Sequence, residues 1–293
     1  MGLIERLKAN GFSFNKSLGQ NFIVDEGFLS ACLSDFGLRE TDAVIEVGAG
    51  AGTLTKVLSS HVSKVYSFEI DKRLEKILLW QLENKSNVQL IIADALKYDF
   101  SNLLKDSEIQ TYKVIANIPY YITTPLLLKF IADSRCTEIC VLVQEELGKR
   151  IVAKHGTKDY GALSITMQAW GTCKIIRRVP RHMFVPPPNV DSVFVQIIKH
   201  STYEQVQTNA TTTPKIIDFN LFSDLVKGLF SFRRKTIANA LSQHLKTNRD
   251  TAIKFLSSVD ISADLRPEDI QVEKFINLAN SMSSRACQGS SEV

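Results

Sequence analysis

The four residues Asn117-Ile118-Pro119-Tyr120 follow an apolar run, and their types could position an amino group for methyl transfer. An aromatic amine, such as the exocyclic nitrogen of adenine, is a poor nucleophile because its lone pair is delocalised into the ring. The side-chain carbonyl of Asn117, with a backbone carbonyl of the turn, could accept both amine hydrogens and align the nitrogen with an electrophilic methyl. Pro119 restricts the turn, and Tyr120 offers a face for a base withdrawn from its stack. The alternative is an ordinary Asn-x-Pro turn after a strand.

A glycine loop, with Gly48, Gly50 and Gly52, lies upstream of this turn. The apolar segment 43–47 predicts a buried strand before the loop, and the segment 53–58 predicts the start of a helix after it. Backbone without side chains can approach a ligand closely, so the loop suits a nucleotide. The dinucleotide pattern G-x-G-x-x-G would need a third glycine where this chain has a threonine, so the spacing favours S-adenosylmethionine. A purely structural turn is the alternative.

Two acidic residues stand at the ends of further predicted strands. Glu69 lies near the end of segment 65–70, where its carboxylate could accept hydrogen bonds from both ribose hydroxyls of a nucleoside. Asp94 follows segment 88–93 and could accept a hydrogen bond from the amino group of the cofactor's adenine. Either residue could instead be a solvated strand end. The glycine loop, both acids and Asn117 follow successive strands, and an open parallel sheet binds ligands at these ends.

The motifs resemble those of the KsgA-type small-subunit ribosomal RNA adenine dimethyltransferase family. The matching segments are 16–22, 46–50, 117–120, 184–192, 232–236 and 266–268. The resemblance implies an α/β fold, namely a Rossmann-like methyltransferase sheet with a small C-terminal helical domain. It also implies S-adenosylmethionine as the cofactor.

The resemblance assigns roles to individual residues as well. It implies that Asn21 and Ile23 cover the cofactor, and that the residues holding it along the sheet are Gly48, Glu69, Asp94 and Asn117. It implies that Tyr120 and Phe184 sandwich the target adenine. Three prolines, 186–188, make the segment after Phe184 stiff, which fixes where its ring points. The alternative is that Phe184 is a core residue and the prolines form a connector.

The resemblance also implies a substrate. Two adjacent adenosines, in the loop of the 3′-terminal hairpin of 16S rRNA, would each receive two methyl groups on an immature 30S subunit during small-subunit biogenesis. One alternative is a large-subunit rRNA adenine methyltransferase that confers antibiotic resistance, because the cofactor and the Asn-x-Pro-Tyr chemistry would look alike. Another alternative is a non-catalytic RNA-binding assembly or transcription factor on the same scaffold.

Composition indicates a globular protein of two domains, with 293 residues, 44% hydrophobic and 23% charged. No apolar run is long enough to cross a bilayer, and the N-terminus lacks a signal-peptide core, so we expect a cytoplasmic protein. Five scattered cysteines argue against a disulfide framework. Dispersed histidines and cysteines give no metal site. We expect a monomer.

The predicted domain boundaries follow changes in sequence pattern. Residues 1–200 alternate strands and helices as a methyltransferase domain would, and the polar segment 201–215 suits an exposed linker. Residues 216–282 show helical spacing of apolar residues and form the expected RNA-contacting domain. Residues 283–293 lack periodicity, so a disordered tail is expected.

The net charge is only +4, so the distribution of charge says more about a polyanionic partner than the total does. Clusters of basic residues flank the proposed site in both domains. They are Arg233, Arg234 and Lys235; Arg178 and Arg181; and Lys149 and Arg150. We interpret them as contacts to RNA phosphates, with a solvated face as the alternative for each cluster.

Overall fold

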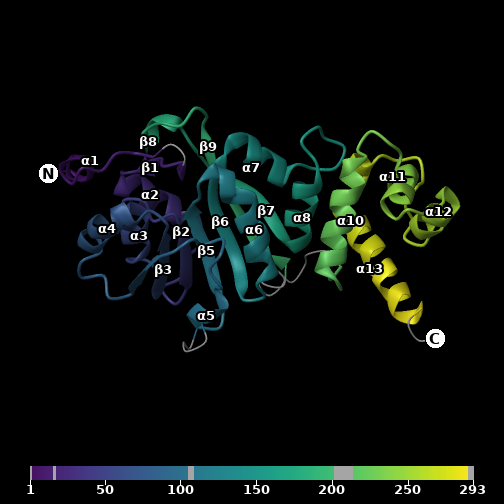
Figure 1. The fold of residues 1–293 in the computed structure, drawn as a ribbon, viewed down its shortest axis with the longest axis horizontal. Coiled ribbons are helices and arrows are strands. Elements are labelled where there is room, and N and C mark those ends of the chain that lie inside the picture. Colours follow the sequence, from purple (N-terminus) through teal and green to yellow (C-terminus); the bar gives the residue numbers. More distant parts are fainter. Residues whose placement is uncertain (1, 16–17, 105–108, 201–213, 290–293) are drawn as a thin grey trace. The chain divides into compact units, whose positions relative to one another are not determined.

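The chain forms two compact units. The computed structural model describes residues 2–15, 18–104, 109–200 and 214–289 (Figure 1). Unit 1 contains the chain up to Gly148 together with residues 174–199, and unit 2 contains residues 149–173 together with the chain from His200 onward.

Unit 1 is built on an open sheet with the strand order β4-β3-β2-β5-β6-β9-β7. Neighbours from β4 through β6 pair in parallel, whereas β9 pairs with β6 in antiparallel fashion. The predicted α/β sheet is thereby confirmed. The strands are β2 (Ala43–Val47), β3 (Lys64–Glu69), β4 (Val88–Ile92), β5 (Tyr112–Asn117), β6 (Cys136–Gln144), β7 (Gly171–Val179) and β9 (Ser192–Lys199).

Helices cover both faces of this sheet, which is why apolar side chains on both faces of the central strands are buried. Val65 and Phe68 of β3 point to opposite faces because side chains alternate along a strand. Val65 packs in a cluster with α2 and α3, whereas the Phe68 ring meets Phe100, which stacks on Phe130 of α6 at 5.1 Å. The helices that precede β6 along the chain are α1 (Leu3–Ala9), α2 (Glu26–Ser34), α3 (Thr53–Leu58), α4 (Glu75–Gln81), α5 (Ser101–Leu104) and α6 (Thr123–Ala132).

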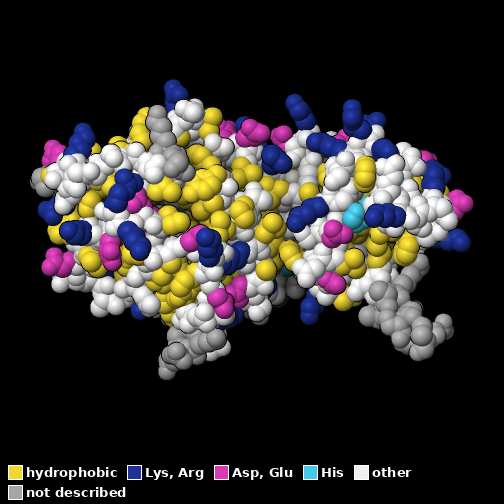
Figure 2. Space-filling view, in the orientation of Figure 1, with side chains coloured by type: hydrophobic (Ala, Val, Ile, Leu, Met, Phe, Trp, Pro, Cys, Tyr) yellow, Lys and Arg dark blue, Asp and Glu magenta, His cyan; other side chains and the backbone are white. Residues whose placement is uncertain are grey.

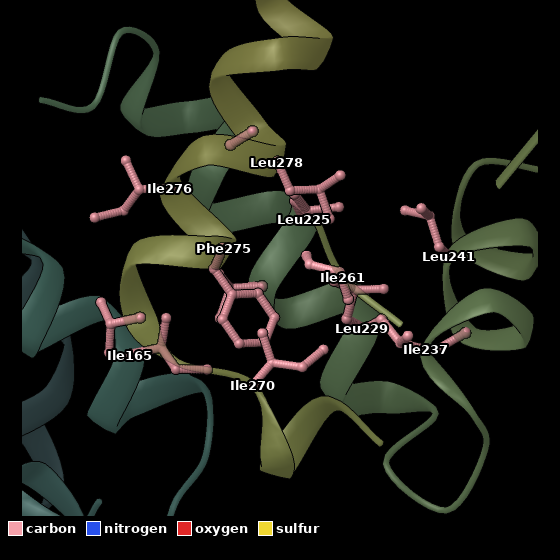
Figure 3. Close-up of a cluster of buried hydrophobic side chains, with 14 of the residues drawn as sticks. Ile165, Leu225, Leu229, Ile237, Leu241, Ile261, Ile270, Phe275, Ile276 and Leu278 are labelled. Carbon is pink, nitrogen blue, oxygen red and sulfur yellow. The ribbon is translucent and has the colours of Figure 1, made fainter. Parts of the chain in front are cut away.

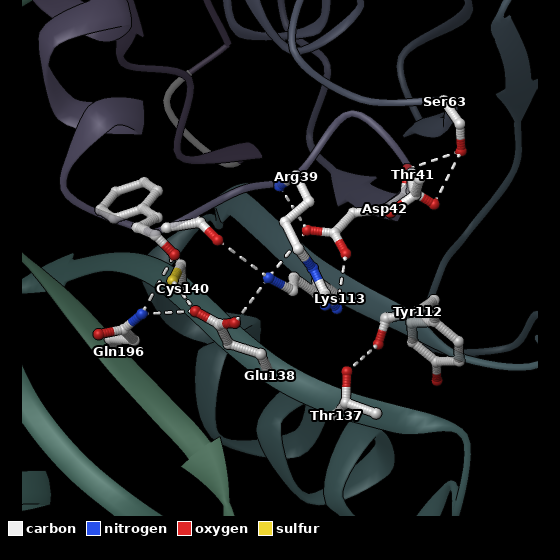
Figure 4. A network of polar contacts seen from close by, with 12 residues as sticks. Arg39, Thr41, Asp42, Ser63, Tyr112, Lys113, Thr137, Glu138, Cys140 and Gln196 are labelled. Carbon is white, nitrogen blue, oxygen red and sulfur yellow. Dashed lines mark hydrogen bonds and ion pairs between the residues drawn. The ribbon is translucent and has the colours of Figure 1, made fainter. Parts of the chain in front are cut away.

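A buried ion network lies where β2, β5 and β6 begin, opposite to their carboxyl ends (Figure 4). Lys113 Nζ lies 2.9 Å from Asp42 Oδ2 and 3.0 Å from Glu138 Oε2. Burial opposes the charge on Lys113, but Glu138 and Asp42 outweigh it and raise the pKa of the ammonium group. Gln196 of β9 donates to Glu138 as well. The network therefore joins the ends of neighbouring strands.

Unit 2 is a helical bundle with its own hydrophobic core, part of which is shown in Figure 3. The core side chains recur at three- and four-residue spacing, as the sequence predicts. Phe222, Leu225 and Leu229 of α10 are fully buried in it, with Phe275 of α13. Helix α7 (Glu145–Val152) belongs to this unit from Lys149 onward. The other helices of the unit are α8 (Ala162–Trp170), α10 (Phe219–Ser231), α11 (Ile237–His244), α12 (Arg249–Ser257) and α13 (Val272–Gly289).

The structure draws the boundary of the helical unit differently from the predicted boundary at residue 200. Residues 149–173 belong to unit 2 because Tyr160, Ile165 and Ala169 are buried in its core cluster. Tyr160 also donates a hydrogen bond to the Ile270 carbonyl at 2.9 Å. Residues 201–213 of the predicted linker lie outside the described residues.

The C-terminal helix also differs from the prediction. Helix α13 runs to Gly289, so the disordered tail expected from residue 283 is wrong for residues 283–289. Those residues contain neither proline nor glycine before Gly289, so nothing in them stops a helix that Phe275 and Leu278 anchor in the core. Residues 290–293 lie outside the described part. None of the described helices combines the length and apolar character that crossing a membrane needs.

Candidate active site

The glycine loop continues directly from β2 and is closely covered from two sides. Gly48, Gly50 and Gly52 have φ values of +85°, +57° and +85°, a region that favours glycine. A Cβ on Gly48 would lie 3.1 Å from the carbonyl oxygen of Asn117, and one on Gly50 would lie 3.0 Å from the ring of Phe22. Glycine is therefore required for close approach as well as for backbone conformation.

Glu69, at the end of β3, is tied to this loop. Its Oε2 accepts from the backbone N–H of Gly50 at 2.8 Å, and its Oε1 accepts from Ile70 and Asp71, each at 2.9 Å. Burial raises the pKa of Glu69, and these backbone donors oppose that shift. Because a carboxylate offers about four acceptor positions, the side chain keeps capacity for a hydroxyl of a ligand.

Asp94 follows β4 and borders the same cavity, with Ile70 and Ala95 beside it. Its Oδ1 accepts from Leu96 N at 3.0 Å, and this bond orients the carboxyl group. Ile70 is 48% exposed. Ile70 and Ala95 give the cavity apolar walls next to an acceptor, which suits a purine carrying an amino group.

Lys129 is a contributor that sequence reasoning missed. From α6 it donates to the carbonyls of Ala95 at 2.9 Å and Leu96 at 2.7 Å, and also to that of Tyr98. Desolvation lowers the pKa of Lys129. These contacts fix the backbone that carries Asp94. No local pattern announces them, because the lysine lies on a later helix.

Asn117 ends β5 with its amide held in one orientation. Its Nδ2 donates to the backbone carbonyl of Asn21 at 2.9 Å. A carbonyl can only accept, so the amide nitrogen must face Asn21 and Oδ1 must face the other way. Asn21, Asn117 and Pro119 all line the cavity. The predicted turn thus presents an amide oxygen at the carboxyl edge of the sheet.

The two predicted stacking rings lie differently. The hydroxyl of Tyr120 is 2.7 Å from Ser192 Oγ, and burial raises the pKa of this half-buried phenol. Phe184 is only 2% exposed and belongs to the core cluster, as does Ile23, its partner in the two-stranded sheet of β1 (Phe22–Ile23) and β8 (Phe184–Val185). The cavity is lined instead by Tyr121, which is 59% exposed.

One cavity therefore collects most of the predicted cofactor site. The predicted residues that line it are Asn21, Gly48, Gly50, Glu69, Asp94, Asn117 and Pro119. Ile23, Tyr120 and Phe184 are not among its lining residues. Across the described residues, no group of histidine, cysteine and acidic side chains could hold a metal ion.

Glu46 is a second residue that sequence reasoning passed over. It is fully buried inside β2, where its Oε2 accepts from Thr55 Oγ1 and Ser67 Oγ, both at 2.6 Å. Burial raises the pKa of Glu46 to about 7, although these two hydrogen bonds act to lower it. Its Oε1 has no hydrogen-bond partner within the described chain. A glutamate in an otherwise apolar strand was a visible signal.

The predicted RNA-contacting cations have different environments in their own units. In unit 1, Arg178 pairs with Asp191 at 2.8 Å, and Arg181 is exposed. In unit 2, Arg233 pairs with Glu268 and donates to the carbonyl of Lys158 at 2.9 Å. Among the predicted cations of unit 2, those that are exposed are Lys149, Arg150, Arg234 and Lys235. On the face shown in Figure 2, basic side chains lie over both units, with acidic ones among them.

Comparison with known proteins gives matches along nearly the whole chain. Residues 11–284 match the family described as ribosomal RNA adenine dimethylase. The chain is 38% identical over 284 residues to the ribosomal RNA small subunit methyltransferase A of Lysinibacillus sphaericus (strain C3-41), covering 95% of this chain and 94% of that protein. It is 37% identical over 283 residues to the protein of the same name from Clostridioides difficile (strain 630), covering 96% and 95%.

Two solved structures share the fold. A dimethyladenosine transferase from Plasmodium falciparum superposes with a TM-score of 0.72 at 24% identity, covering 89% of this chain and 97% of that chain. The 23S rRNA methyltransferase ErmE gives a TM-score of 0.65 at 21% identity, covering 90% and 100%. At these identities the likeness concerns architecture, and it confirms the predicted Rossmann-like methyltransferase fold.

Proposed function

The chain belongs to the ribosomal RNA adenine dimethylase family, and we propose that its cavity is where S-adenosylmethionine methylates adenosine amino groups of small-subunit rRNA. The family resemblance predicted from the motifs is confirmed by the match and by relatives named ribosomal RNA small subunit methyltransferase A. Those names favour small-subunit over large-subunit rRNA. We further propose that two adjacent adenosines of the 3′-terminal 16S hairpin are each dimethylated on an immature 30S subunit. The enzyme would act in the cytoplasm as a monomer.

The residues lining the cavity fit this cofactor. When bound, S-adenosylmethionine supplies an electrophilic methyl group on a sulfonium. Glu69 keeps acceptor capacity for a ribose hydroxyl, and Asp94 can accept from an adenine amino group between Ile70 and Ala95. The glycine loop leaves backbone, without side chains, next to Asn117. Both carboxylates suit the neutral nucleoside end of such a ligand.

The single observation that carries the reaction is the bond from Asn117 Nδ2 to the carbonyl of Asn21. It turns Oδ1 away from Asn21 as an acceptor for one hydrogen of the target amine. The Pro119 carbonyl already accepts from Ile122 N at 3.1 Å and from Thr123 Oγ1 at 3.3 Å. We therefore assign the second hydrogen to the carbonyl of Ile118. Two fixed acceptors orient the nitrogen lone pair for in-line attack.

No general base is assigned to the reaction. Attack makes the amine cationic and strongly acidic, so its proton can pass to solvent without help. The buried carboxyl of Glu46 is sequestered behind Thr55 and Ser67, away from such a role.

Tyr120 and Phe184 are proposed as the rings that hold the target base. Tyr120 is half-buried and is held through Ser192, so its ring is placed before substrate arrives. Phe184 is buried in the core cluster, on the strand that pairs with β1, so its use as a stacking ring requires a shift of the segment from Phe184 to Asn189. The exposed cations of both units are proposed to contact RNA phosphates, which position a substrate without reading its sequence.

A methylation assay tests the proposal. Immature 30S particles are expected to accept methyl groups from S-adenosylmethionine, and the products should include dimethyladenosine by mass spectrometry of the 16S rRNA. Protein-free large-subunit RNA is the matched alternative substrate. Methylation of that RNA alone would support the resistance enzyme instead, and RNA binding without methylation would support the non-catalytic assembly factor.

A further inference from the structure

Residues 18–23, here called the N-terminal strap, contact two separate segments that line the cavity. Phe22 lies against Gly50, and the position of a Cβ on Gly19 would be 3.3 Å from Cβ of Pro119. The Asn21 carbonyl accepts the bond that orients Asn117. The strap therefore contacts the glycine loop and the Asn117 turn at once, so its position bears on cofactor and substrate alike.

Gln20 ties the strap to the end of β3. Its Nε2 donates to Asp71 Oδ2 at 2.7 Å, and its Oε1 accepts from Asn15 N at 2.7 Å. The two ends of the amide thus have partners of opposite type, and only one orientation satisfies both. Asp71 is 7% exposed, so this contact is shielded from water.

Arg73 holds the carboxylate of Asp71 in place. Asp71 Oδ1 accepts from Arg73 N at 3.1 Å and Nε at 2.8 Å, and Oδ2 accepts from Nη2 at 2.6 Å. The hydrogen bonds from Arg73 lower the pKa of Asp71 and keep it charged. The Arg73 guanidinium also lies 5.2 Å from the centre of the Phe12 ring, so it packs against the segment before the strap.

Asp71 is joined to the cavity from its other side through its backbone. Its N–H donates to Glu69 Oε1 at 2.9 Å, while Glu69 Oε2 accepts from Gly50 N at 2.8 Å. A continuous series of hydrogen bonds therefore runs from the glycine loop through Glu69 and Asp71 to Gln20 of the strap. The same strap then meets Asn117.

We propose that Asp71 is a positioning residue for methyl transfer: through Gln20 it holds the strap over the cavity and keeps the Asn117 amide oxygen turned toward the substrate. This inference rests on the proposed function. In this proposal Asp71 itself contacts neither the cofactor nor the RNA.

Two variants and one matched control test it. Asp71→Asn keeps the size of the side chain but presents Gln20 with either an amide donor or a single acceptor oxygen. Gln20→Leu removes the other partner of the same hydrogen bond. The control is Asp133→Asn. Asp133 accepts from Arg135 N at 3.0 Å, Nε at 3.1 Å and Nη2 at 3.1 Å, which repeats the Asp-x-Arg contact at a site away from the cavity.

The rate of a single turnover is measured on immature 30S particles at saturating S-adenosylmethionine, together with amide hydrogen exchange of residues 18–23 in RNA-free protein. Both strap variants are expected to lose about ten- to a hundredfold in rate, the fold-change that corresponds to the free energy of a hydrogen bond to a charged group. Their strap amides should exchange faster. The control should keep rate and exchange within about twofold of wild type.

Wild-type rates and exchange in Asp71→Asn and Gln20→Leu would overturn the inference, as would an equal loss in Asp133→Asn. Thermal melting is followed for every variant, and rates are compared only where the protein is folded. If wild type methylates no rRNA, the proposed function fails. Hydrogen exchange, which needs no RNA, still decides whether Asp71 holds the strap.

Discussion

Asn117 and Asn21, from distant parts of the chain, are joined by a 2.9 Å hydrogen bond from a side-chain amide to a backbone carbonyl. The bond fixes which end of the amide faces the cavity. A site for an amine nucleophile needs an acceptor there, and a free asparagine would divide its time between two orientations. The amide is therefore set before a substrate binds, which lowers the entropy cost of aligning the reacting groups.

Asn117→Ala removes the oriented acceptor, and we expect the methylation rate to fall by about 10²- to 10³-fold, as for other oriented catalytic hydrogen-bonding groups. RNA affinity should change little because the cations proposed to contact phosphates are untouched. Single-turnover methylation and filter binding of the same RNA measure the two quantities. Near-normal methylation would remove Asn117 from the proposed role.

Gly50→Ala should weaken cofactor binding. The new Cβ would stand 3.0 Å from the Phe22 ring at a φ of +57°, so both the strap and the backbone are strained. Gly156→Ala is the control, because Gly156 has φ of +77° with nothing within 4 Å of its Cβ position. Both should lose about 1–2 kcal/mol of stability from backbone strain. Only Gly50→Ala should reduce S-adenosylmethionine affinity in calorimetry, and equal affinities for the two variants would contradict the predicted contact.

Glu46 predicts a pH dependence of stability. Its pKa is raised by burial from 4.5 to about 7, so between these values the folded state binds more protons than the unfolded state. Stability from this group is complete below pH 4.5 and is lost as pH rises toward 7. The loss is at most roughly 3 kcal/mol. Urea unfolding of wild type and Glu46→Gln across this range measures it, with the exposed Glu26→Gln as control.

Glu46→Gln should flatten that profile, because the amide does not titrate and can still accept from Thr55 and Ser67. A variant whose free energy of unfolding falls with pH as steeply as that of wild type would show that another group is responsible.

Lys113→Met should destabilise the fold while sparing catalysis. The substitution leaves Asp42 and Glu138 buried without their shared cation, and such a change costs about 3–5 kcal/mol. The network lies at the start of β5, whereas Asn117 lies at its end. Urea unfolding should show the loss, and adding Glu138→Gln should recover part of it. A reduced methylation rate in folded Lys113→Met protein would contradict this separation.

Much of the site could be predicted because its determinants are local. The glycine loop, Glu69, Asp94 and Asn117 each directly follow or end a strand whose apolar pattern is plain, and parallel strands bring such ends to one edge. Contacts between distant segments were not predictable from pattern. Lys129 reaches the loop after β4 from a helix, and nothing in its neighbours indicates that target.

The burial of Phe184 and the extent of unit 2 also depend on contacts between distant segments, which the sequence pattern does not predict. The stiff proline segment fixes Phe184, but only the pairing of β8 with β1 decides that its ring lies in the core. Residues 149–173 read as part of an alternating α/β pattern. The apolar face of α8 joins α10 and α13 instead, which becomes visible only when the helices are packed.

Arg233 and Arg234 are neighbours with different expected roles. Arg233 is bound to Glu268 and to the carbonyl of Lys158, so Arg233→Ala should lower the melting temperature by releasing those contacts. Arg234 is exposed, so Arg234→Ala should leave melting unchanged and weaken RNA binding uniformly. The slope of log affinity against log salt should fall by about one for Arg234→Ala. Binding to immature 30S particles at several salt concentrations tests this. An unchanged slope would assign Arg234 to a solvated face, because a phosphate contact releases counterions whatever the RNA sequence.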